Sequence, residues 1–260
     1  MNVPRYTLDT MQREFPNDDV CLDFIFQKRY GHLEYCPRCA VQTKFYRIKT
    51  RKYYKCPHCA FELYPLANTI FHKSETPLTK WFFAIYLFSN AKNGTSAKEL
   101  ERHLGVTYKC AWRMAKQIQH MMQENGDILS GIVEKQKGEG HIKAFTTKQA
   151  DATVTLPFLR ANIQSGSTLH TDDSRIYSRA KRDFTHEFVK HSKLEYVRAG
   201  VHTNTIEGFW GQLKRSLDGT YHCVSPKYLQ SYVNEFVYRY NHRHDAAFPA
   251  LLEAAVKRVQ

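Results

Sequence analysis

The stretch that decides the fold of the N-terminal part is residues 36–59, CPRCAVQTKFYRIKTRKYYKCPHC. It begins and ends with a CxxC pair, and 16 residues separate the two pairs. Each CxxC forms a tight knuckle with two thiolates, and two knuckles complete a tetrahedral four-sulfur site with no open position. The pattern therefore predicts a structural zinc ribbon whose Zn²⁺ ligands are Cys36, Cys39, Cys56 and Cys59.

The segment between the pairs, FYRIKTRKYYK, alternates aromatic and basic residues and predicts a β-hairpin around Lys49-Thr50. Residues 35–61 hold seven basic side chains and no acidic one. Part of this charge balances the negative charge of a zinc ion with four thiolates. The other interpretation is contact with DNA, for which the candidates are Arg47, Lys49, Arg51 and Lys52.

Length and composition bound the class of protein. The 260 residues are 42% hydrophobic and 24% charged, which excludes a mostly disordered chain and a fibrous rod. The 38 Lys and Arg against 25 Asp and Glu give a formal net charge of +13, which favours a polyanionic partner. Nucleic acid is the first candidate.

The number of cysteines and the lengths of the apolar runs indicate the cellular compartment. Seven cysteines are an odd number, which argues against a fully paired disulfide framework. The longest apolar run, residues 81–88, is too short for a membrane span, and the N-terminal residues MNVPRYTLDT lack the apolar stretch expected of a signal peptide. We expect a cytoplasmic protein without a membrane partner, in which Cys21, Cys110 and Cys223 are buried, unliganded thiols.

Residues 76–122 read as helical. Thr76-Pro77 starts an almost entirely apolar helix, and Asn93-Gly94 breaks it. A short helix, a turn at Gly105 and a second helix follow, which is the pattern of a helix-turn-helix. The alternatives are DNA contact by Lys109 and Arg113 or an ordinary helical hairpin with a solvated basic face.

The C-terminal half alternates strand and helix patterns, which indicates an α/β layer. GIVEK, HIKAFTTK, STLHTDD and HEFVKHS are predicted strands, and ADATVTLPFLRANI is a predicted helix. Asp172 directly follows the third of these strands, and Glu207 lies in a predicted helix with Lys214 and Arg215. Two carboxylates brought together can hold Mg²⁺ for phosphodiester transfer, but each alone is also an ordinary capping or solvated acid.

Longer segments resemble a known family. The two CxxC pairs, ANTIFHKSETPLTKWFFAIYLF, HTDDSRIY, VKHSKLEYV and HTNTIEGFWGQLKRSLDGTYHCVSPKYLQSYVNEFVYRYNHR are similar to IS1595-like insertion-sequence transposases. The resemblance implies an ISXO2-type, RNase H-like domain with a DDE triad that uses two Mg²⁺ ions. It also implies terminal-repeat and target DNA as partners and a homo-oligomer on DNA. Asp172 matches the second acid, and Glu207 the final acid, with Lys214 and Arg215 as DNA-contact candidates.

The family's first acid has no counterpart in this chain. A strand with a DET-like element should follow the helical region, but the sequence runs through Asp127 into GIVEKQKGEGHIKAF, which resembles the family's next two strands. We expect an internal truncation that removes the first strand. Glu134 is the weak substitute candidate for the missing acid, and Asp127 is the other.

The predicted fold class is α+β and multidomain. We expect an N-terminal helical lead and zinc ribbon (1–74), a helix-turn-helix-like DNA-binding segment (75–125) and an RNase H-like domain lacking its first strand (126–260). The leading hypothesis is a bacterial DDE transposase, nucleoid-associated when bound to DNA. The alternatives are a non-catalytic DNA-binding relic or regulator and a zinc ribbon that binds protein partners.

Overall fold

The structure is a computed structural model that describes residues 6–49, 51–123, 140–149, 151–189, 197–198 and 201–257. The chain forms two compact units, of which the first comprises Met1–Met122 with His244–Gln260 and the second Gln123–Arg243. From the sequence we expected residues 126–260 to form one domain. In the structure the C-terminal segment His244–Gln260 lies in the first unit instead. GIVEK, Glu134 and Asp127 lie outside the described residues.

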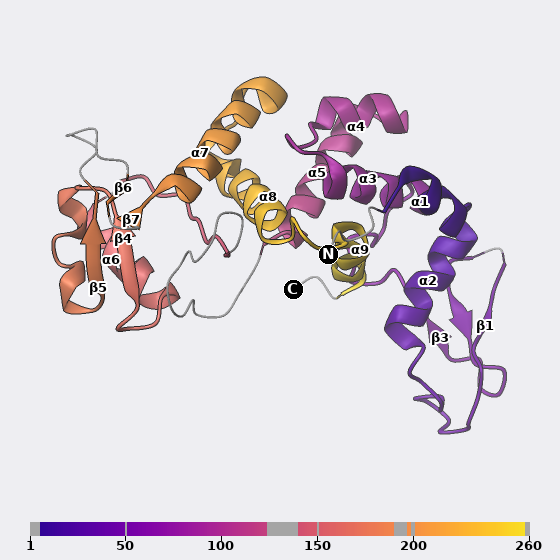
Figure 1. Cartoon of the computed structure of the whole chain (residues 1–260). Helices are drawn as coiled ribbons and strands as arrows, with labels where there is room; N and C mark the ends of the chain where they lie inside the picture. Colours follow the sequence, from indigo (N-terminus) through magenta and orange to yellow (C-terminus); the bar gives the residue numbers. More distant parts are fainter. Residues whose placement is uncertain are drawn as a thin grey trace. The chain divides into compact units, whose positions relative to one another are not determined.

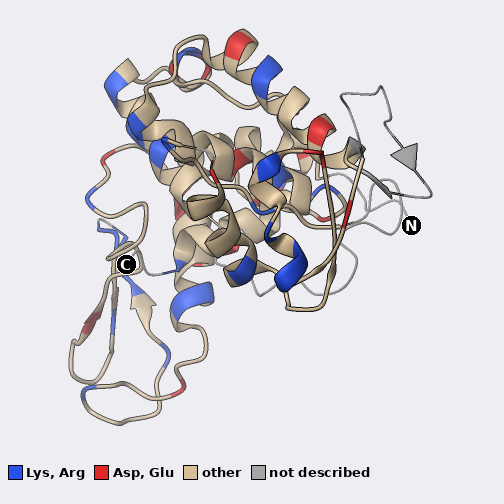
Figure 2. Ribbon diagram, turned by 90° about the vertical axis from the view of Figure 1, so that its left-hand side faces the viewer, with Lys and Arg blue, Asp and Glu red and all other residues tan. Residues whose placement is uncertain are grey.

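The first unit joins a small zinc-ribbon sheet to a group of helices (Figure 1). Its elements are α1 (Leu8–Glu14), α2 (Asp18–Tyr30), β1 (Tyr46–Arg47), β2 (Tyr54–Lys55), β3 (Glu62–Leu63), α3 (Leu78–Asn90), α4 (Ala97–Leu104), α5 (Tyr108–Met121) and α9 (Ala247–Val256). The strands pair antiparallel in the order β1-β2-β3, which confirms the predicted hairpin. Lys and Arg positions recur along this hairpin, in the lowest part of Figure 2.

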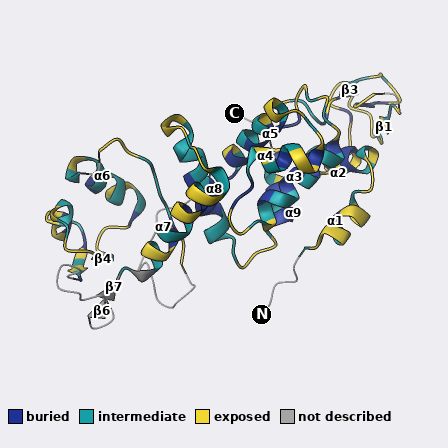
Figure 3. Cartoon of the chain, turned by 90° about the horizontal axis from the view of Figure 1, so that it is seen from above, coloured by how far each residue is buried: buried dark blue, intermediate teal, exposed yellow. Residues whose placement is uncertain are grey.

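Helix α3 forms the centre of the first unit. Leu78, Trp81, Phe82, Ile85 and Phe88 are at most 2% exposed, so nearly every face of the helix is covered, as its apolar sequence predicts. Helices α2, α5 and α9 all pack against it, and Figure 3 shows the dark-blue buried stretches there. The C-terminal helix α9 therefore belongs to this core.

Helices α4 and α5 are two helices joined by a turn, as predicted, and they pack against each other. The side chain of Ser96 accepts a hydrogen bond from the N–H of Glu99, and that of Thr107 accepts one from the N–H of Cys110, so each caps the first turn of its helix. Gly105 ends α4 with φ of 58°, a left-handed conformation that favours glycine. The inner sides of the pair are buried, with Leu100 and Met114 at 0% exposure.

The second unit contains short strands and three longer helices within its described residues. Its elements are α6 (Ala152–Asn162), β4 (Thr168–Thr171), the 3₁₀ turns Arg175–Tyr177 and Ala180–Arg182, β5 (Thr185–Phe188), β6 (Val197–Arg198), β7 (Val201–His202), α7 (Asn204–Ser216), the π turn Leu217–Tyr221, the 3₁₀ turn Pro226–Tyr228 and α8 (Leu229–Asn241). Strands β4 and β5 pair parallel from Thr168↔Thr185 to Thr171↔Phe188, and β6 pairs antiparallel with β7. The predictions of strands β4 and β5 and of helices α6 and α7 are confirmed.

The predicted strand HIKAFTTK is wrong, because residues 141–149 pair with no other strand in the described part of the chain. Side chains of α8 bind its backbone instead. The Asn241 amide accepts from the N–H of Ile142 at 2.7 Å and donates to its carbonyl at 3.0 Å. The Gln230 amide accepts the N–H of Thr146 at 2.7 Å. A helix thus satisfies backbone groups that a neighbouring strand normally pairs.

A buried carboxylate connects the end of α7 to α8. Glu235 is 0% exposed, and its two oxygens accept from the Tyr221 hydroxyl at 2.9 and 2.8 Å. Arg239 donates to the same carboxylate at 2.7 Å. Nearby, Phe209 and Leu213 of α7 pack with residues of α8 in one apolar cluster. These contacts hold α7 against α8 and so keep the exposed residues of α7 in a fixed position.

None of the helices in the described parts of the chain is long and apolar enough to cross a membrane.

Candidate functional site

The two CxxC knuckles have the same backbone conformation. The N–H of Ala40 donates to the carbonyl of Cys36 at 2.9 Å, and the N–H of Ala60 donates to that of Cys56 at 3.0 Å. Both alanines lie in the left-handed region, with φ of 54° and 55°, which costs a non-glycine residue about 1–2 kcal/mol. The repeated strained turn brings the two thiols of each knuckle to one side.

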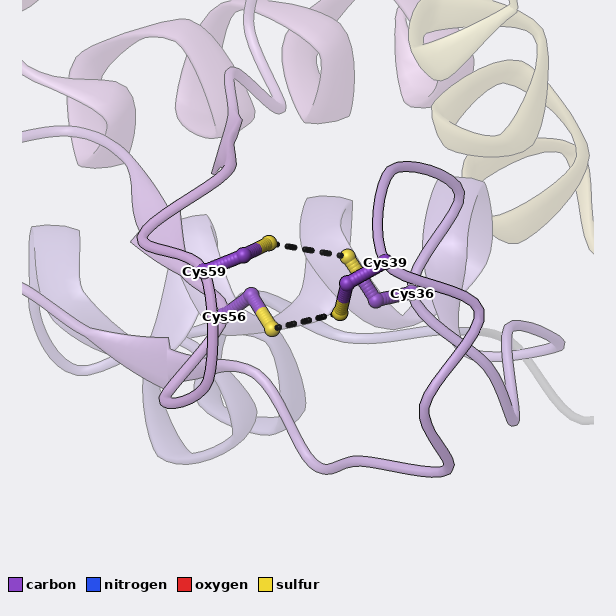
Figure 4. Close-up of side chains that lie close together, drawn as sticks. All are labelled: Cys36, Cys39, Cys56 and Cys59. Carbon is purple, nitrogen blue, oxygen red and sulfur yellow. Dashed lines mark hydrogen bonds between the residues drawn. The ribbon is translucent and has the colours of Figure 1, made fainter.

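The four cysteine sulfurs lie together (Figure 4). The Cys36 and Cys59 sulfurs are 3.6 Å apart, those of Cys39 and Cys56 are 3.9 Å apart, and all four lie within 4.8 Å of one another. A tetrahedral zinc with Zn–S bonds of about 2.3 Å requires sulfurs about 3.8 Å apart. The cysteines therefore fit a structural Zn²⁺ that has no coordination position left for a substrate.

Backbone amides favour the thiolate form of two ligands. Burial raises the pKa of both Cys36 and Cys56. Hydrogen bonds from the N–H groups of the knuckles outweigh it and hold both pKa values below the usual range of a thiol. Since zinc binds thiolate, this arrangement prepares the knuckles for the metal.

Arg47, a predicted DNA contact, faces α2. Its guanidinium forms an ion pair with Asp19 and lies 3.8 Å from Asp23. Its neighbour on β2, Tyr54, donates to Asp23 and stacks on Phe26 with ring centroids 3.8 Å apart. Burial and this carboxylate raise the pKa of Tyr54. In this structure Arg47 joins the ribbon to α2.

The other three predicted hairpin contacts, Lys49, Arg51 and Lys52, are exposed. The outer side of the sheet also exposes Tyr46 by 46% and Tyr64 by 48%, which the sequence analysis did not select. Strand alternation could have predicted the exposure of Tyr46, because this residue directly precedes Arg47, whose side chain faces α2.

The two predicted contacts on α5 are at the surface. Lys109 is exposed near the start of the helix. Arg113 is exposed, and its guanidinium donates to the Ser74 hydroxyl at 3.3 Å. Tyr108 is 45% exposed, with the Lys98 ammonium 4.9 Å from its ring centroid. The start of α5 thus presents both cationic and aromatic groups.

Asp172 directly follows β4 and is exposed. One of its carboxylate oxygens accepts the N–H of Ser174 at 3.1 Å. The Thr171 hydroxyl donates to the Asp172 carbonyl at 2.7 Å and lies 2.9 Å from Nε2 of His186 on β5. Burial and then Lys181 lower the pKa of His186. The backbone at Asp172 is therefore held on the sheet while its carboxylate faces solvent.

Glu207 lies in the first turn of α7 and is also exposed. The Thr203 hydroxyl donates to its carboxylate at 2.6 Å. Lys214 and Arg215 are exposed in the last turn, and Arg215 donates to the Gln212 side chain at 3.3 Å. The acid and the basic pair occupy opposite ends of one helix.

The close group of metal-ligating side chains found among the described residues lies in the first unit. Among the described residues, the four cysteines are the group of three or more metal-ligating side chains that lies close enough to hold one ion. Strand β7, which leads into α7, lies beside β4, which leads to Asp172. Glu134 and Asp127, the two substitutes for the first acid, are outside the described residues. Cys21 is buried as expected, but the expectation is wrong for Cys110, which is half-buried, and for Cys223, which is exposed.

Comparison with known families assigns both parts of the chain. Residues 16–61 match the transposase zinc-ribbon domain, and residues 102–241 match the ISXO2-like transposase domain. The second match alone spans more than half of the chain. The protein is thus of the transposase class and carries a transposase zinc ribbon. The chain belongs to the IS1595 family of insertion-sequence transposases.

A relative supports the same assignment. The chain is 24% identical over 275 residues to an uncharacterized protein in transposable element ISH50 of Halobacterium salinarum. The aligned region covers 87% of this chain and 92% of the relative. No solved structure matches the chain.

Proposed function

We propose that the chain is a DDE-type DNA transposase that binds the terminal repeats of its element and performs Mg²⁺-dependent cleavage and strand transfer. The observation that carries the proposal is the position of two acids within the family match. Asp172 directly follows a parallel strand, and Glu207 lies in the first turn of the helix that follows the neighbouring strand β7. Strand ends and helix starts are common positions for functional groups in α/β folds.

Asp172 and Glu207 would hold the metal. Both are exposed carboxylates, and oxygen ligands of this kind suit Mg²⁺. When bound, the ions would activate a water or a 3′-hydroxyl and stabilise the leaving oxygen. Lys214 and Arg215 would bind DNA phosphates, and Glu134 or Asp127 would supply the third carboxylate of an RNase H-like site. The parallel β4–β5 pair with α6 is compatible with that fold.

The first unit would recognise DNA. Lys49, Arg51 and Lys52 would contact phosphates near the hairpin tip, and Lys109 with Arg113 would do so from α5, which is placed as the second helix of a helix-turn-helix. Zn²⁺ would serve only the fold of the ribbon. A transposase of this kind would act in the cytoplasm, as a homo-oligomer that brings two transposon ends to a target.

A strand-transfer assay with the full chain and DNA carrying the element's terminal repeats tests the proposal. Wild-type protein should cut and join the ends with Mg²⁺. Glu207→Gln and Asp172→Asn should each abolish joining while DNA binding is kept, because both substitutions remove a ligand charge without changing the shape of the side chain.

The matched control is Glu187→Gln, an exposed acid on β5 in the same sheet as Asp172. It should leave joining unchanged. Full activity in Glu207→Gln would overturn the assignment of the site.

A second candidate function is a DNA-binding relic or regulator without catalysis. It is favoured by the missing first acid, since the chain has no DET-like element after the helical region. It predicts salt-dependent binding to the terminal repeats without nicking in either Mg²⁺ or Mn²⁺. Nicking that disappears in Glu207→Gln would exclude it.

A further inference from the structure

The outward face of α7 combines an aromatic ring with charged groups. Phe209 and Leu213 point into the apolar cluster shared with α8. At 100° per residue, Glu207 and Lys214 lie away from that cluster, and Trp210 lies between them and Leu213, about 60° from Leu213 at the edge of the cluster. All three are exposed, and the rise of a helix separates Trp210 from Lys214 by about 6 Å along the axis.

Trp210 is more exposed than the tryptophan of the first unit's core. The indole is 36% exposed, whereas Trp81 in the first unit is 0% exposed. Its ring makes an edge contact with Phe209, with centroids 5.1 Å apart. An exposed indole beside cationic side chains can serve as a stacking surface for a base.

Two glycines lie within the same helix, where each is less favourable than alanine by about 1 kcal/mol. A Cβ added at Gly208 would meet nothing within 4 Å, and one added at Gly211 would meet only Arg215 Nη1 at 3.4 Å. The packing within the described part of the unit therefore does not demand glycine at either position. Close approach of a partner to the helix surface would explain both.

We propose that Trp210 stacks on an unpaired or terminal base of a DNA end while Lys214 binds the adjacent phosphate. The inference rests on the proposed function and deepens it, since it names how the end is recognised next to Glu207. An indole provides a sequence-tolerant stacking surface for any base, and a neighbouring cation binds the backbone. Lys214 and Arg215 give this helix a net positive charge against the single acid Glu207, which favours nucleic acid over an apolar protein partner.

The place of Trp210 on α7, close to Glu207, indicates how its ring would act. Stacking on the indole would hold a terminal base away from its partner strand. Glu207 lies about 4.5 Å along the helix axis from Trp210, one turn away. A base stacked on the ring would bring its own phosphate toward that carboxylate, so Trp210 acts by positioning the end.

The test uses the full chain with Ca²⁺ in place of Mg²⁺, so that binding is measured without catalysis. One duplex ends at the terminal repeat and carries 2-aminopurine as its last base, and a second has the same repeat embedded in flanking DNA. Wild-type protein should change the 2-aminopurine fluorescence and prefer the free end. Trp210→Ala should lose roughly 5- to 150-fold in affinity for the end, with unchanged affinity for the embedded repeat.

Trp210→Tyr is the matched variant, because it retains a stacking ring of similar kind, and it should recover most of the preference. Unchanged 2-aminopurine fluorescence with wild-type protein would overturn the proposal, even if Trp210→Ala failed to fold. Equal weakening on both duplexes would also overturn it and would indicate that the ring packs against another part of the chain or a second copy.

The outcome is separable from that of the proposed function. Loss of strand transfer in Glu207→Gln with normal 2-aminopurine response would support both. An inactive wild-type protein that still shows the response would refute catalysis and retain the recognition of the end.

Discussion

The four-cysteine group of the zinc ribbon and the two acids proposed for the second unit are built in two different ways. The four cysteines lie within a 24-residue stretch, and two identical backbone turns bring their sulfurs together. Asp172 and Glu207 belong to separate elements, and each carboxylate is exposed. A site built from local turns is complete once its own segment folds. A site built from distant elements depends on the contacts that hold those elements in place.

The largest effect is expected from a substitution that disrupts the four-cysteine site. Cys56→Ser should remove zinc and unfold the ribbon, because structural zinc contributes apparent binding free energies of about 10–16 kcal/mol in small zinc modules. Bound zinc per chain and the circular dichroism of the full protein measure this loss. Cys223→Ser is the control, since Cys223 is exposed and lies outside both knuckles, and it should bind zinc normally. Normal zinc content in Cys56→Ser would refute the four-cysteine site.

The second prediction concerns what holds α7 in the second unit. Arg239→Leu removes a cation that donates to the fully buried carboxylate of Glu235 at 2.7 Å. An unpaired buried charge costs about 3–5 kcal/mol, so the unfolding transition of this unit should move to much lower urea concentration. Arg215→Leu, on the exposed face of α7, should leave it unchanged.

The double variant Glu235→Leu with Arg239→Leu separates the charge from the packing. Replacing both partners of a buried pair by apolar groups is often nearly neutral, so the double variant should regain most of the stability lost in Arg239→Leu. If both variants are equally unstable, the shape of the two side chains rather than the charge pair supports α7.

The sequence predicted most of what depends on nearby residues. The CxxC spacing identified the zinc ligands because a knuckle is formed by its own backbone. Periodicity and capping residues located α3 to α5, and the strand before Asp172 was recognised as an apolar run that ends in acids. In each case the decisive contacts lie within a few positions of one another.

The failures concern contacts between distant segments. The extended residues 141–149 have the composition of a strand, but their backbone groups bind Gln230 and Asn241 of α8. No local pattern reveals that helix as a partner. Likewise α9 packs against α3, although some 160 residues separate them, and this contact places the C-terminal segment in the first unit.

The smallest expected effects distinguish Arg47, which holds the ribbon against α2, from Lys49, a proposed DNA contact. Arg47 is paired with Asp19, an exposed carboxylate, so Arg47→Ala should lower the stability of the ribbon by at most about 1 kcal/mol. Lys49 is exposed, so Lys49→Ala should leave stability and zinc content unchanged. It should reduce the slope of log K for DNA against log salt concentration by about 0.9, the contribution of one phosphate contact. Fluorescence anisotropy at several salt concentrations measures this slope. An equal change of slope in Arg47→Ala would mean that its guanidinium leaves α2 to bind DNA, and the ribbon would then lose its anchor whenever it bound.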